Sequence, residues 1–180
     1  MNEIAMPRTA AHLVESLRMT NTGTSVFIEI LVLSGSHIAE TDREKEFVIW
    51  LAQRDQNIIG RGTVGFDLDE MPWLEHDLEP MKQFMLRMID GARKKTQWQM
   101  LDYEPSEDWC HVTLDHFAAM MQAFDQSHVD EQQYIEWTTL DEEDDYEPTI
   151  PVGYPKCAQH DVYLSCLGCV ICNSKKGGND

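Results

Sequence analysis

The stretch "MKQFMLRMIDGARKK", from Met81 to Lys95, carries the clearest signal for the fold of this chain. Its apolar side chains recur at spacings of three, four, seven and eight residues, at Met81, Phe84, Met85, Met88 and Ile89. This recurrence has the period of an α-helix with one buried side. Three cations, Arg93 to Lys95, end the stretch, where the helix dipole favours positive charge. The stretch therefore predicts an amphipathic helix whose methionines pack in a core.

Much of the remaining chain has a similar helical period. Further helices are expected in residues 40–55, 108–129 and 130–140. Thr41 or Asp42 can cap the first of these, and residues 7–19 also fit a helix. Residues 24–35 carry β-branched side chains typical of a strand, but their apolar spacing favours a helix. The sequence predicts a mainly α fold with a single helical domain.

Composition narrows the class of protein. The 180 residues are 42% hydrophobic and 26% charged, enough for one buried core and a small appendage. No apolar run reaches the roughly 18 residues of a membrane helix. The first residues have neither the basic start nor the apolar centre of a secretory signal. We therefore expect a cytoplasmic protein with reduced thiols, in which clustered cysteines favour metal binding over disulfides.

The chain is strongly acidic, with 32 acidic against 14 basic residues and a net charge of −18. The excess lies in the first 150 residues, because the last 30 hold nearly equal numbers of both signs. Such a surface repels nucleic acid and anionic membranes, whose binding requires cations. It attracts a basic protein instead. The alternative is that the acidity serves only solubility.

Two acidic stretches beside aromatic residues are candidates for contact with a basic partner. The candidates in residues 66–79 are Asp67, Asp69, Glu70, Trp73, Glu75 and Asp77. Those in residues 140–147 are Asp141, Glu142, Glu143, Asp144 and Asp145. Carboxylates that pair with arginine or lysine around a buried aromatic centre suit such a surface. The alternatives are that Trp73 packs inside the protein and that the second stretch is a solvated linker.

The stretch "CAQHDVYLSCLGCVIC", residues 157–172, holds four of the five cysteines and one histidine. A zinc ion takes four nitrogen or sulfur ligands in a tetrahedron, which two pairs of residues with C-x-x-C spacing can supply. The predicted ligands are Cys157, His160, Cys169 and Cys172, because the segment between the pairs is long enough to form a hairpin. Cys166 is the alternative ligand in place of Cys172. The site is expected to be structural, with zinc as the cofactor.

Three regions follow from these patterns. Residues 1–140 are expected to form the acidic helical domain, and residues 141–156 an acidic, proline-containing linker. Residues 157–180 are expected to form the zinc-binding tail, a small C-terminal zinc-knuckle appendage.

The tail resembles a zinc-ribbon knuckle pair, in which the proline-led "PKCAQH" meets a later C-x-x-C. The resemblance covers about 25 residues, and Cys169 to Cys172 lack the glycine that is common beside the second pair. It implies a structural zinc. The whole chain resembles acidic bacterial toxin-immunity proteins in size, acidity and the look of "IGRGTVGFDLDEMPW", residues 59–73. That resemblance implies an inhibitor of a nuclease-like toxin; the alternative is a zinc-ribbon adaptor that acts through its tail.

Motifs for catalysis are weak. Gly60, Gly62 and Gly65 match the G-x-G-x-x-G pattern of dinucleotide sites. The residues that follow, "FDLDEMPW", place acids and a proline where the phosphate-binding helix should begin, which favours a simple turn. The sequence has no P-loop, G-x-S-x-G or H-E-x-x-H motif. We therefore expect a binding protein rather than an enzyme.

Overall fold

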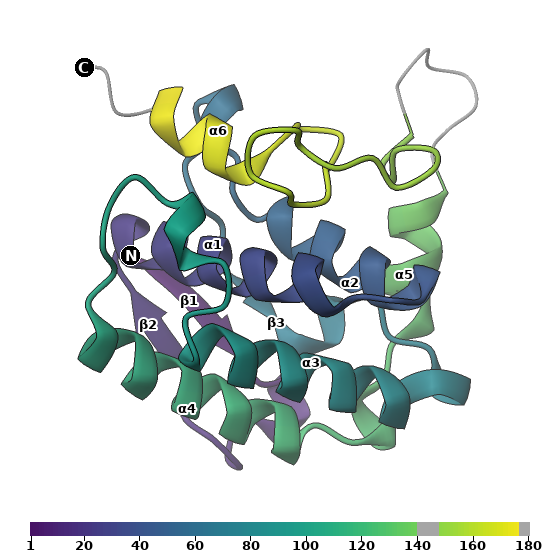
Figure 1. Cartoon of the computed structure of the whole chain (residues 1–180). Coiled ribbons are helices and arrows are strands. Elements are labelled where there is room, and N and C mark those ends of the chain that lie inside the picture. Colours follow the sequence, from purple (N-terminus) through teal and green to yellow (C-terminus); the bar gives the residue numbers. More distant parts are fainter. Residues whose placement is uncertain (140–147, 177–180) are drawn as a thin grey trace.

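The computed structural model describes residues 1–139 and 148–176, and over this part of the chain the predicted mainly α fold is confirmed (Figure 1). The helices are α1 (Asn21–Ile38), α2 (Asp42–Ala52), α3 (Leu78–Arg93), α4 (Glu107–Ala123), α5 (Glu131–Thr138) and α6 (Val170–Lys176). The strands are β1 (Asn2–Ala5), β2 (Leu17–Met19) and β3 (Phe66–Asp67). Among the described helices, none combines the length and apolar character needed to cross a membrane.

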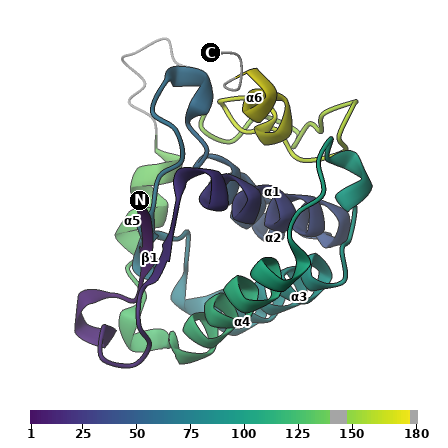
Figure 2. The ribbon, with the colours of Figure 1, turned by 90° about the vertical axis from the view of Figure 1, so that its left-hand side faces the viewer.

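The helices form layers, with α1 and α2 between the α3–α4 pair and the C-terminal segment (Figures 1 and 2). Every residue of α1 from Phe27 to Ser36 is buried, because the helix has neighbours on several sides. This burial explains why residues 24–35 are so apolar that they resemble a strand. The prediction of a helix there is confirmed. The side chain of Thr20 caps α1 by accepting a hydrogen bond from the Gly23 amide.

The methionine stripe lies in the core, as predicted. Met85 and Met88 of α3 are fully buried and Met81 is nearly so, in a helix that packs against both α1 and α4. Gly35 lets α1 approach α3 closely, since a Cβ atom there would lie 2.4 Å from the Met88 sulfur. The hydroxyl of Ser34 also donates a hydrogen bond of 2.7 Å to the Met88 carbonyl. The contact between these two helices therefore combines close packing with one buried hydrogen bond.

The predicted helix at residues 7–19 is wrong. Only η1 (Arg8–Ala10) is helical there, and Leu17 to Met19 form β2, which pairs antiparallel with β1. Leu17 and Met19 point inward while Arg18 is exposed, which is the two-residue period of a strand. Three residues are too few for that period to stand out against the helical spacing. Pairing with β1, itself parallel to the distant β3, decides the outcome.

The glycine-rich segment "GRGTVG" is a turn that brings two backbones together. A Cβ atom at Gly65 would lie 2.1 Å from the carbonyl oxygen of Glu3, so only glycine fits beside β1. Gly60 and Gly62 adopt positive φ angles of 77° and 70°. The segment leads into β3 and then η3 (Leu68–Glu70), not into a helix long enough to receive a phosphate. The interpretation as a structural turn agrees with this arrangement.

The C-terminal segment packs directly on the helical body. Val162, Val170 and Ile171 are buried in the same apolar core as α1 and α2. The ammonium group of Lys156 donates to the Ser36 carbonyl at 3.0 Å, and the Tyr163 amide donates to the Ser36 hydroxyl at 3.1 Å. The C-terminal end of α1 is therefore the platform on which the cysteine-rich segment rests.

Candidate metal centre and acidic surface

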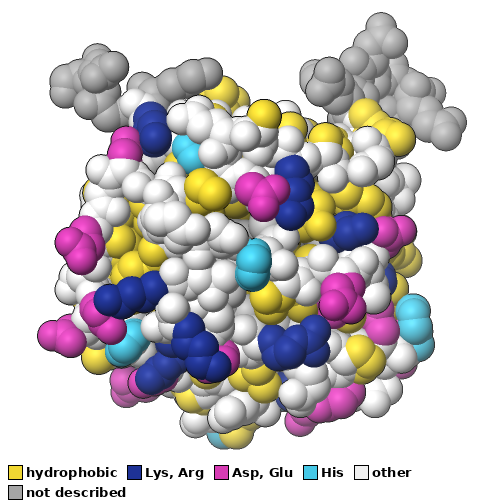
Figure 3. Space-filling model, in the orientation of Figure 1, with side chains coloured by type: hydrophobic (Ala, Val, Ile, Leu, Met, Phe, Trp, Pro, Cys, Tyr) yellow, Lys and Arg dark blue, Asp and Glu magenta, His cyan; other side chains and the backbone are white. Residues whose placement is uncertain are grey.

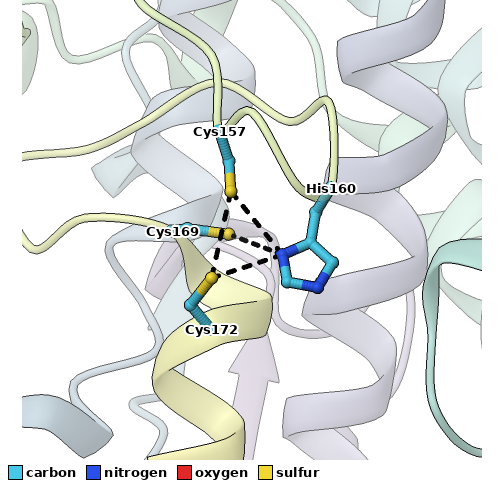
Figure 4. Close-up of side chains that lie close together, drawn as sticks. All are labelled: Cys157, His160, Cys169 and Cys172. Carbon is cyan, nitrogen blue, oxygen red and sulfur yellow. Dashed lines mark hydrogen bonds between the residues drawn. The ribbon is translucent and has the colours of Figure 1, made fainter.

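Four side chains of the C-terminal segment converge on one point (Figure 4). They are the predicted ligands Cys157, His160, Cys169 and Cys172, and their ligand atoms all lie within 4.8 Å of one another. Cys157 and His160 come from a turn after Pro155. Cys169 immediately precedes α6 and Cys172 lies in its first turn. The group can hold a metal ion, so this part of the sequence-based prediction is confirmed.

The distances within the group fit a tetrahedral ion. The His160 Nδ1 atom lies 3.6, 3.5 and 3.3 Å from the sulfur atoms of Cys157, Cys169 and Cys172. The sulfur atoms of Cys157 and Cys172 are 3.9 Å apart. Bonds of about 2.3 Å to sulfur and about 2.0 Å to nitrogen place tetrahedral ligands about 3.5 to 3.8 Å apart. These four separations are close to that range, and all the ligand atoms lie within 4.8 Å of one another, so the group is compact enough to hold one ion.

The first ligand pair is shaped by a short hairpin. The Cys157 amide donates to the Val162 carbonyl at 2.8 Å, and the Asp161 amide donates back to the Cys157 carbonyl at 2.8 Å. Asp161 adopts a positive φ of 55°, a conformation that aspartate tolerates better than most residues. Burial opposes ionisation of the Cys157 thiol, but the backbone amides of Gln159 and His160 hold its pKa below the ordinary value. The turn therefore favours the thiolate that a metal needs.

His160 and Cys169 form the buried side of the group. His160 is only 2% exposed; burial lowers its pKa, and the nearby Lys175 charge lowers it further, so its imidazole is neutral. A neutral ring nitrogen is the form that binds metal. Burial raises the pKa of Cys169 to about 12, so an ion must displace a proton from this thiol. Because ligation requires that displacement, metal affinity falls as the pH is lowered.

Cys166, the alternative ligand, lies outside this group. It is exposed, and the Gln53 side-chain amide donates to its sulfur at 3.4 Å. Gln53 also donates to the Thr149 carbonyl at 3.0 Å and accepts from the Trp137 indole at 2.6 Å. Gln53 thus links the C-terminal segment to α5, a role that the sequence did not indicate.

Three carboxylates of the first acidic stretch lie together. Burial raises the pKa of Asp67, Asp69 and Glu70, and neighbouring negative charges raise it further. Those charges include Glu3 beside Asp67 and Asp130 beside Asp69. Within the described ranges, none of the three makes an ion pair. We call Asp67, Asp69 and Glu70 the acidic surface. It is negative, although the charge of Arg54 acts on Glu70 and partly opposes the rise of its pKa.

The rest of that stretch serves the fold. Trp73 is fully buried, its ring is stacked on Phe124 at 5.1 Å, and its indole donates to the Leu68 carbonyl at 2.7 Å. Its proposed contact with a partner is therefore wrong, because the core hides the whole side chain. Asp77 accepts a 2.7 Å hydrogen bond from Arg43, an ion pair largely shielded from water. Glu75 remains exposed.

The second acidic stretch, Asp141, Glu142, Glu143, Asp144 and Asp145, lies outside the described residues. The helix that precedes it, α5, contacts η3. Asp130 and Glu136 therefore lie near the acidic surface, although the sequence did not mark them as site residues, and Trp137 lies there too. The α3–α4 face in Figure 3 differs, because lysine and arginine side chains are spread among its acidic ones.

In comparisons with known proteins, no protein-family model, no curated protein and no solved structure matches the chain. The resemblance to toxin-immunity proteins receives no support from these comparisons.

Proposed function

We propose that Cys157, His160, Cys169 and Cys172 bind one structural Zn²⁺. The observation that carries this assignment is the convergence of three thiols and one imidazole, whose ligand atoms all lie within 4.8 Å of one another. Soft thiolate ligands with imidazole suit zinc better than magnesium or calcium, which prefer oxygen. Four protein ligands complete the tetrahedron and leave no position for a substrate, which is the pattern of a structural rather than a catalytic site. Metal analysis tests the assignment, with one zinc per chain expected.

The zinc would act by holding the C-terminal segment against α1. The buried residues of this segment are few, and a piece of this size cannot supply its own folding free energy by burial alone. Metal ligation adds the missing free energy, because the ligands come together only in the folded state.

We further propose that the protein binds a basic macromolecule through its acidic surface. What supports this is the crowding of Asp67, Asp69 and Glu70, which form no ion pair among the described residues and whose pKa values are raised by burial and by neighbouring carboxylates. Crowded carboxylates gain most from a cationic partner, which relieves their mutual repulsion. An inhibitor of a basic toxin, as in bacterial immunity proteins, is one protein of this kind. The acidic residues 141–145 belong to the same proposal on sequence alone.

The alternative is an adaptor that docks through its zinc-ribbon-like tail. It has less support, because Val162, Tyr163 and Ile171 point into the body and are not available to a partner. Deleting the tail would also uncover the core, so loss of binding in such a deletion would not identify a docking surface.

Replacing the three surface carboxylates should strongly reduce capture of the partner. We expect wild-type protein to retain a basic protein from host extract in a salt-sensitive manner, and the Asp67→Asn, Asp69→Asn, Glu70→Gln variant to retain at least about tenfold less. The fold should persist, because these side chains make no ion pairs with described residues. Quantitative mass spectrometry of the retained proteins measures the difference.

The matched control removes the same net charge elsewhere. Glu15, Glu40 and Glu104 are exposed on other parts of the chain, and their replacement by glutamine changes the net charge equally. This control should retain the partner. Equal losses in both variants would mean that overall charge, not the acidic surface, drives retention.

A further inference from the structure

A pocket of about 290 Å³ opens between the end of α2, η3 and α5. Its lining residues are Trp50, Arg54, Glu70, Gln133, Glu136 and Trp137. Sites for small molecules typically measure about 300 to 1,000 Å³, so this pocket has the size for one side chain rather than a large cofactor. It lies at the acidic surface, because Glu70 belongs to both.

Tryptophan side chains provide the apolar part of the pocket. Trp50 is only 2% exposed and is held edge-on against Phe66 at 5.0 Å. Trp137 is half-buried, and its indole nitrogen donates to Gln53 at 2.6 Å, which fixes the orientation of the ring. A fixed, partly exposed ring beside carboxylates is a site for a cation, which the negative face of the ring attracts.

The charge in and around the pocket is negative. Glu70 and Glu136 are exposed and line the pocket. The carboxylates of Asp67 and Asp69 lie near Glu70, and that of Asp130 lies near Asp69. A planar group with several donors can pair with two carboxylates at once.

Among the described residues that line this pocket, Arg54 is the one cation. Its guanidinium lies 4.3 Å from the centre of the Trp50 ring, and its buried Nε has no hydrogen-bond acceptor among the described residues. Burial lowers its pKa, and Glu70 is the carboxylate that opposes this effect. Arg54 therefore offsets part of the negative charge of the pocket. Glu136 and the ring of Trp137 can still contact a second cation.

We propose that this pocket receives an arginine side chain of the basic partner, with the guanidinium between Glu70 and Glu136 and against the ring of Trp137. The proposal rests on the proposed function and adds the chemistry of the contact. Arginine fits better than lysine on physical grounds, because its flat guanidinium can stack on a ring and donate to two carboxylates together.

The probe is the blocked tripeptide acetyl-Gly-Arg-Gly-amide, followed by NMR of the indole N–H groups of the five tryptophans. We expect a saturable shift of the Trp137 signal, assigned with Trp137→Phe, while the signals of Trp73 and Trp109 stay in place. The same peptide with neutral citrulline in place of arginine keeps the shape but not the charge. It should bind at least about fivefold more weakly.

Variants that remove a carboxylate or a cation from the pocket test whether it selects positive charge. Glu70→Gln and Glu136→Gln should each weaken binding of the arginine peptide severalfold, whereas Arg54→Gln should strengthen it. Glu15→Gln, which removes a carboxylate outside the pocket, should leave it unchanged. Both glutamates are exposed, so their variants should fold normally, and the other indole signals verify this.

Equal binding of the arginine and citrulline peptides would overturn the proposal, as would a Trp137 signal that does not move. Weaker binding by Arg54→Gln would also overturn it, because the pocket would then select an acceptor rather than a cation. If the pocket fails in this way while the acidic-surface variant still loses the partner, the proposed function stands. If the peptide binds but no basic protein is retained, the pocket assignment stands and the proposed function fails.

Discussion

Replacing Cys169 by serine should abolish zinc binding and release the C-terminal segment from the helical body. Cys169 is 6% exposed, and its sulfur lies 3.5 Å from the His160 ring nitrogen, inside the ligand group. Serine is a poor zinc ligand, and the three remaining side chains leave an incomplete tetrahedron. Zinc at about 1,000 times its Kd adds about 4 kcal/mol to the free energy of unfolding of a segment that folds around it. The variant loses that contribution.

Hydrogen exchange measures this release directly. The amides of Cys157 and Asn173 donate to backbone carbonyls within the segment and should exchange much faster in Cys169→Ser. Amides of α1 and α3 should keep their protection, since most of the core lies outside the segment.

The matched control is Cys166→Ser, at an exposed cysteine outside the ligand group. It should retain zinc and slow exchange in the segment. Loss of zinc from Cys166→Ser, with zinc retained by Cys172→Ser, would show that the ligand set is the alternative one, because Cys169 belongs to both sets.

Replacing Trp73 by alanine should destabilise the whole protein by about 3–5 kcal/mol, the usual range for removing a large buried aromatic side chain. The ring is packed between Phe47 at 4.7 Å and Phe124 at 5.1 Å, and its indole hydrogen bond to Leu68 is also lost. Denaturant unfolding measures the change in the free energy of unfolding.

Asp69→Asn is the control for this prediction, because Asp69 lies on the acidic surface and only four residues away. Its effect on stability should be small. A stable Trp73→Ala variant that fails to bind the basic partner would contradict the assignment of Trp73 to the core and restore it as a contact residue.

The sequence predicted those features that short-range patterns determine. The stripe of Met81, Met85 and Met88 repeats within one helix, and the four metal ligands lie within sixteen residues, so local spacing was enough. The helix at residues 24–35 was harder, because burial on several sides of α1 removes the polar positions that mark a helical period.

Features that depend on distant residues could not be predicted in this way. β2 forms because β1 pairs with it, and the pairing competes with a local helical spacing. Asp77 looked like a surface charge until the structure placed Arg43, 34 residues earlier, beside it. Asp130 and Glu136 join the acidic surface only because α5 lies against η3. The spacing of residues along the sequence does not predict contacts between segments that are far apart in the chain.

Metal analysis of the purified protein tests the zinc centre most directly. Protein produced with ample zinc under reducing conditions, then freed of loosely bound metal by gel filtration, should contain one zinc per chain, and Cys169→Ser should contain almost none. Protein that is folded and reduced but carries no zinc would contradict the assignment of Cys157, His160, Cys169 and Cys172 as a structural zinc site.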